Sequence, residues 1–217
     1  MALERVGGRG ANQLRPIDCS RNVLSRAHGS ASCSHGTPQF FLPSVRFWFS
    51  HYRVGETRVL ASVFGPKAGT KKNENPEKAC IEVIWKPKTG QSGKPEKEFE
   101  MILKRTLQHI CLLNVHPNTT TSIVVQVVHD DGSLLPCAIH AACAALTDAG
   151  IPLKYLAESG QIILDPTKLE EQKMKAFVYL AFPSSVQSVL PEGSTNGIIT
   201  SLTHGVMAGY ASHSYIL

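Results

Sequence analysis

Three carboxylates lie close together late in the chain and are the acidic side chains best placed for chemistry. They are Asp165, Glu170 and Glu171. Neighbouring carboxylates can bind a divalent metal ion, which activates a bound water as a nucleophile. A carboxylic acid can also give a proton to a leaving oxygen. These residues are the candidate catalytic group, and we expect no metal or other cofactor unless they act together on a divalent metal ion.

A candidate anion site precedes an alanine-rich run over residues 134–149, which predicts a helix. Backbone N–H groups at a helix N-terminus bind phosphate, and Ser133 stands at that position. Arg105 could add a guanidinium, because it lies roughly 130° from the centre of the apolar stripe on its own predicted helix. The alternatives are a serine that only caps its helix and an arginine that only faces solvent.

Basic residues gather in two predicted loops that flank one predicted strand. Such lysines can contact phosphates and give salt-sensitive, sequence-independent binding of RNA. The alternative is a pair of solvated basic loops. Trp85 beside Lys86 could stack on a base or belong to the core. The lysines of the two loops are Lys67, Lys71, Lys72, Lys86, Lys88, Lys94 and Lys97.

Composition bounds the class of protein. The 217 residues are 42% hydrophobic and 18% charged, which is typical of a globular domain. The net charge of +5 permits contact with nucleic acid without requiring it. No apolar run reaches the roughly 18 residues of a membrane span, and the first residues lack the apolar core of a secretory signal. We therefore expect a cytosolic or nuclear protein.

Cysteine usage agrees with that compartment. The chain has six cysteines and no Cys-x-x-Cys pair, and several of the six stand in apolar stretches. We expect all of them to be reduced and mostly buried, without a zinc site or a disulfide.

The elements that must position these residues follow from hydrophobic periodicity. Alternation predicts strands from residue 57 to a stop at Gly65-Pro66, over 80–85 and over 121–128. A stripe with helical spacing predicts a helix across 99–110. Further strands are expected at 162–164, 176–182, 185–190 and 197–202. The order indicates an α+β fold, a sheet with two helices on one face.

Four motifs then resemble the RNase PH family of exoribonucleases. Residues 26–31, RAHGSA, are similar to its RxDGSA element, and 55–66 to its GxTxVxAxVxGP strand. Residues 128–152 resemble its DG…AAINAA…ALxDAGIP helix, and 164–171 its LDPTxxEE element. The resemblance implies a mixed sheet packed with helices, similar to ribosomal protein S5 domain 2. It also implies a ring subunit of the RNA exosome, beside other RNase PH-like subunits and S1/KH cap subunits around an RNA channel.

The same resemblance bears on activity. Leu135 stands where active members carry a phosphate-binding arginine, and the second acid falls near Lys175 or Ala176, which are not acidic. Asp165 belongs to a structural turn in the family, and Arg105 matches an arginine facing the phosphate site. The loop with Lys86, Lys88 and Lys94 corresponds to one that contacts RNA.

We therefore expect a structural and RNA-path subunit of the 3'-5' exoribonuclease complex that lacks phosphorolytic activity. It would act in rRNA processing and RNA degradation, in the nucleus, nucleolus and cytoplasm. The alternative is a residual metal-dependent nuclease acting alone or as a homodimer. A weaker third alternative is a small binding module outside any exosome.

Three departures from the family pattern affect the expected domain. We expect a flexible N-terminus over 1–14 and one domain over 15–208, interrupted by an atypical aromatic insertion at 37–54. An apolar strand is missing after Ala157, ahead of an expected turn at Glu158-Ser159-Gly160, and 209–217 form an atypical tail. A lost strand removes hydrogen bonds and apolar cover, so this chain is expected to be poorly stable and to enter a ring badly.

Overall fold

The computed structural model of the chain describes residues 13–36, 57–68, 76–90, 93–154, 156–160, 165–174, 176–184 and 199–205. The insertion at 37–54, the tail at 209–217 and the expected strands at 162–164 and 185–190 lie outside these residues. No helix in the described ranges is long and apolar enough to cross a membrane.

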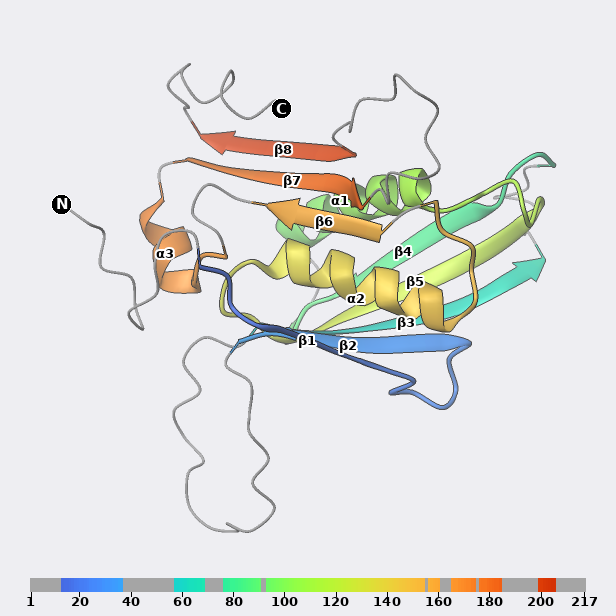
Figure 1. The fold of residues 1–217 in the computed structure, drawn as a ribbon, viewed down its shortest axis with the longest axis horizontal. Helices are drawn as coiled ribbons and strands as arrows, with labels where there is room; N and C mark the ends of the chain where they lie inside the picture. The colour runs from blue at the N-terminus through green and yellow to red at the C-terminus, as the bar shows by residue number, and fades with distance from the viewer. Residues whose placement is uncertain are drawn as a thin grey trace, which may run out of the picture.

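A five-stranded mixed sheet forms one layer of the fold (Figure 1). Its order is β1-β2-β3-β5-β4, and only the β4–β5 pair is parallel. That pair is parallel because α1 carries the chain back between the two strands. The strands are β1 (Ile17–Arg21), β2 (Gly29–His35), β3 (Thr57–Ala68), β4 (Cys80–Lys86) and β5 (Thr119–His129).

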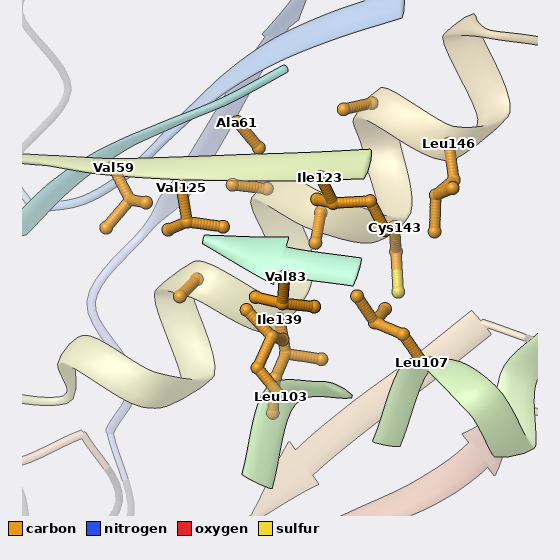
Figure 2. Packing of buried hydrophobic residues seen from close by; sticks show 14 of the residues in the cluster. Val59, Ala61, Val83, Leu103, Leu107, Ile123, Val125, Ile139, Cys143 and Leu146 are labelled. Atoms are coloured by element: carbon orange, nitrogen blue, oxygen red, sulfur yellow. The ribbon is translucent and has the colours of Figure 1, made fainter. Parts of the chain in front are cut away.

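The two long helices pack on one face of this sheet. Helix α1 (Lys94–Ile110) lies mainly against β4, and α2 (Leu134–Asp148) lies against β2 and β3. Figure 2 shows the resulting core, where Val59, Ile123 and Leu103 are all fully buried. The predicted apolar stripe is confirmed, since Leu103, Leu107 and Ile110 of α1 are 0% exposed. The small residues of α2 let the helix approach very closely: a Cβ on Gly29 would lie 2.3 Å from the Ala149 nitrogen.

A second, three-stranded antiparallel sheet covers the other side of the helices, so α1 and α2 lie between two sheets (Figure 1). Its strands are β6 (Leu156–Gly160), β7 (Ala176–Ser184) and β8 (Thr200–Gly205). A hydrogen bond of 2.8 Å between the Thr106 and Thr200 hydroxyls joins α1 to this sheet. The expected turn at Glu158-Ser159-Gly160 is wrong, because these residues pair with Phe182, Ala181 and Leu180 of β7. A short strand therefore occupies the place where the sequence suggested a missing one.

Two further expectations fail. Gly65-Pro66 does not end β3, which continues to Ala68 through a register shift and a cis peptide bond. The six cysteines are not all reduced: Cys19 and Cys33 form a disulfide, while the other four are free. The register explains the bond, because Cys19 of β1 and Cys33 of β2 are direct antiparallel partners with Cα atoms 4.2 Å apart.

Candidate functional site

Arg15, a residue that the sequence analysis did not single out, organises the centre of the candidate site. It is 5% exposed and reaches Asp165 across 150 positions of the chain. Its backbone N–H donates to Asp165 Oδ2 over 2.9 Å and its Nε over 2.6 Å. Its Nη1 donates to the Asp131 carbonyl over 3.1 Å. Arg15 therefore ties the N-terminal segment to the β5–α2 turn and to the segment that leads into α3 (Lys168–Lys173).

Asp165 is committed to this contact. Its side chain is buried, and its Oδ1 lies 3.8 Å from His35 Nδ1. Burial alone would raise the pKa of Asp165, but the nearby His35 ring, the hydrogen bonds from Arg15 and the charge of Arg15 outweigh it and leave the pKa well below its ordinary value. The carboxylate is therefore held ionised, with its oxygens directed at protein donors.

The N-terminus of α2 is occupied by a carboxylate of the chain itself. Ser133 is 2% exposed and its backbone N–H donates to Glu171 Oε1 over 2.7 Å. The Ser133 hydroxyl does not cap the helix; it donates to the Pro166 carbonyl over 3.3 Å. Burial raises the pKa of Glu171, against the hydrogen bond from Ser133, and the nearby charge of Asp130 raises it further. The carboxylate of Glu171 thus occupies the N-terminus of α2, where an external anion would otherwise bind.

The segment that begins at Asp165 approaches the β5–α2 turn so closely that position 132 has no space for a residue larger than glycine. A Cβ on Gly132 would lie 2.4 Å from the Pro166 carbonyl oxygen, and Gly132 has φ +85°. Thr57 Oγ1 donates to the Gly132 carbonyl over 2.6 Å and accepts from the Asp131 N–H over 3.0 Å. The start of β3, the β5–α2 turn and the Asp165 segment are therefore one packed unit.

Two other candidates have local roles in this arrangement. Glu170 Oε2 accepts the Thr167 backbone N–H over 2.9 Å, which completes a capping box at the start of α3. Leu135 is 2% exposed in the first turn of α2 and offers no donor to an anion there. Within the described residues no group of three or more His, Cys, Asp or Glu side chains is arranged to hold a metal ion.

The basic candidates fall into two places. Lys86 ends β4, Lys88 follows it and Lys94 begins α1, and all three are exposed. Because β4 and β5 are parallel, with Lys86 opposite Gln126, these lysines lie at the end of the sheet where β5 leads into the α2 turn. Gln126 Nε2 donates to the Pro87 carbonyl over 3.0 Å and fixes the loop there.

Arg105 is separated from that end of the sheet. It is exposed on α1, eleven positions after Lys94, which corresponds to about 16 Å along the helix axis. Trp85 is 2% exposed and packs on Phe99 with ring centroids 5.4 Å apart, so it belongs to the core and not to a base-stacking surface.

Comparisons with known proteins accord with this architecture. The model of the RNase_PH family, described as "3' exoribonuclease family, domain 1", matches residues 13–152. The Exosome complex exonuclease RRP46 homologs of Arabidopsis thaliana and of Oryza sativa subsp. japonica are 61% and 55% identical to this chain, and each alignment covers 96% of the chain and 86% of the relative.

Solved structures give the same picture. The crystal structure of rice Rrp46 matches with a TM-score of 0.76 at 56% identity, over 93% of this chain and 85% of that one. The Archaeoglobus fulgidus exosome with RNA bound to the active site matches with a TM-score of 0.70 at 17% identity, over 95% of this chain and 84% of that one, which shows a shared fold.

Proposed function

The chain belongs to the RNase PH family of 3' exoribonucleases, and on that premise we propose that it is a structural and RNA-path subunit of the RNA exosome. The observation that carries this proposal is the 61% identity to an RRP46 homolog over 96% of the chain. The proposed partners are the other RNase PH-like ring subunits, the S1/KH cap subunits and RNA. The proposed roles are rRNA processing and RNA degradation in the nucleus, nucleolus and cytoplasm.

The proposal includes the absence of phosphorolysis by the chain itself. Phosphorolysis needs cationic donors around inorganic phosphate, and buried Leu135 supplies none at the α2 N-terminus. The Ser133 N–H is already paired with Glu171, and Asp165 is paired with Arg15. These contacts support a structural role for the region. The purified chain is expected to release no nucleoside diphosphates from RNA in the presence of phosphate.

The RNA path is proposed to pass the end of the sheet where Lys86, Lys88 and Lys94 are exposed. Phosphate contacts from lysines need no sequence signal and weaken as salt rises. Arg105 would contribute only to a different stretch of RNA, because it lies farther along α1.

A matched pair of charge reversals tests both halves of the proposal. Lys86→Glu with Lys88→Glu alters the proposed RNA path, and Lys67→Glu with Lys78→Glu makes the same change in charge at the opposite end of the sheet, where both lysines are exposed. Each tagged chain is expressed in plant cells, purified with its partners and crosslinked to RNA. The first pair is expected to lower crosslinking about tenfold at low salt, with a smaller effect at high salt, and the second to change it little.

The outcomes separate the two halves. Equal crosslinking by both pairs would remove the lysines from the RNA path while leaving the subunit role intact. If the unaltered chain fails to co-purify with any ring subunit, the subunit role itself is wrong.

A further inference from the structure

The six cysteines of the chain differ sharply in accessibility. Cys33, Cys111, Cys137 and Cys143 are buried and Cys80 is half-buried, whereas Cys19 is exposed. Cys19 lies on β1, an edge strand whose five side chains are all exposed, and it is bonded to Cys33, its register partner on β2. The disulfide therefore joins one cysteine at the surface to one in the core.

The neighbouring thiols cannot readily compete for this bond. Cys137 Sγ donates to the Cys33 carbonyl over 3.4 Å, which places this free thiol beside the pair. Burial raises the pKa of Cys137 to about 12 and that of Cys111 to about 12. Only a thiolate attacks a disulfide, so the Cys137 and Cys111 thiols stay inert toward the Cys19–Cys33 bond.

We propose that Cys19 and Cys33 form a reversible redox site for low-molecular-weight thiols of the glutathione class, with Cys19 as the modified residue and Cys33 as the resolving residue. Two observations carry this assignment: Cys19 and Cys33 are direct partners in the strand register, and Cys19 is exposed whereas Cys33 is buried. Accessible cysteines beside a resolving cysteine are those on which reversible mixed disulfides form.

The exchange balances in two steps. A glutathione thiolate attacks Cys19 Sγ, the Cys19–Cys33 bond breaks, and Cys33 leaves as a thiolate that takes up a proton. A second glutathione thiolate attacks the glutathione sulfur of the mixed disulfide, releasing the Cys19 thiolate and forming glutathione disulfide. The two electrons that reduce the protein come from two glutathione molecules, and oxidation runs the same steps in reverse.

The bond acts on the strand next to Arg15. Among the described strands β1 pairs only with β2, and its side chains bury little apolar surface. Besides the strand ladder, the Gly36 N–H donates to the Pro16 carbonyl over 3.1 Å. Reduction should therefore loosen residues 17–21 selectively, while the other four strands of the sheet stay paired.

Thiol mapping on the full chain tests the proposal. The purified chain is equilibrated at pH 7 over a range of reduced-to-oxidised glutathione ratios, quenched in acid, denatured, alkylated and mapped by mass spectrometry. Cys19 and Cys33 are expected to become protected together as the ratio turns oxidising, while Cys111, Cys137 and Cys143 are alkylated throughout. Hydrogen exchange in 17–21 should speed up about tenfold or more on reduction, with β5 unchanged.

Variants identify the modified residue. Cys33→Ala removes the resolving thiol, so Cys19 should retain one glutathione per chain under oxidising conditions. Cys19→Ser should take up none at Cys33, because Cys33 is buried. Cys80→Ser is the matched control and should leave the transition of the pair unchanged. Alkylation of Cys19 and Cys33 at every ratio, or a disulfide between Cys19 and any other cysteine, would overturn the proposal, and neither result depends on the variants folding.

Discussion

Replacing Arg15 by methionine should be among the most damaging single changes in this chain. Methionine fills much of the space of the arginine stem but lacks the guanidinium. The change removes the Nε donor to Asp165, 2.6 Å away, and the donor to the Asp131 carbonyl. Asp165 is 7% exposed, so its charge would stay buried without the cation. Breaking a buried ion pair from one side costs about 3–5 kcal/mol, a large part of a total stability of about 5–15 kcal/mol.

Urea unfolding measures this loss, and a double-mutant cycle assigns it. Asp165→Asn alone should also be destabilising, but Arg15→Met with Asp165→Asn should lose clearly less than the sum, by about 1 kcal/mol or more. Arg26→Met is the control, because Arg26 is exposed and its loss should cost about 0.5 kcal/mol or less.

The pH dependence gives an independent check. The pKa of Asp165 is depressed in the folded chain, so the unfolded chain takes up a proton first as pH falls below about 4. The stabilisation from this pair is thus present above that pH and lost below it. Arg15→Met should flatten this acid-side loss. A cost below about 1 kcal/mol, or strictly additive single variants, would refute the reasoning.

Three further changes give separate predictions. Gly132→Ala places a Cβ 2.4 Å from the Pro166 carbonyl oxygen at φ +85°, so it should cost about 2–4 kcal/mol by urea unfolding; an unchanged midpoint would contradict the close approach. Burial, with a smaller contribution from His35, lowers the pKa of His140 from 6.5 to about 4. The unfolded chain therefore binds the proton first, and stability should fall by about 3 kcal/mol between those pH values, a slope that His140→Asn should remove. Glu171→Gln keeps an acceptor for the Ser133 N–H. Since the folded pKa of Glu171 is raised, the neutral variant should be more stable than the parent at pH 7, by an amount that vanishes as pH falls; lower stability at pH 7 would show that the ionised form is needed.

Sequence periodicity predicted the helices and strands whose burial follows from the spacing of their own apolar residues. Leu103, Leu107 and Ile110 of α1 repeat with the helical period and pack on a sheet, so their burial could be read directly from their spacing. Val59, Ala61 and Val63 of β3 alternate for the equivalent reason in a strand. The α+β fold followed from the order of such elements.

Features set by long-range pairing were not predictable in this way. The Cys19–Cys33 bond depends on the register of β1 with β2, and a separation of 14 residues carries no sign of it. β6 pairs with β7 although Glu158, Ser159 and Gly160 read locally as a turn. Arg15 could not be singled out from the sequence, because its partner is 150 positions away. Asp165, Glu170 and Glu171 could be named as a group from the resemblance to the LDPTxxEE element, but their separate partners could not.

The distance between Arg15 and Asp165 along the chain also sets an order of events during synthesis. A ribosome adding about 5–20 residues per second would take roughly 8–30 s to make the chain between them. Through that interval the five-stranded sheet and α2 can form, and Arg15 can meet Asp131, which lies 3.5 Å from its Nη1 in the folded chain, but its main partner Asp165 has not yet been made. The segment around residue 15 is therefore translated first and fixed last. A chain that stops before Asp165 would lack this contact, and the segment around residue 15 would stay accessible to chaperones and proteases. The buried pair therefore forms only after the C-terminal part has been made.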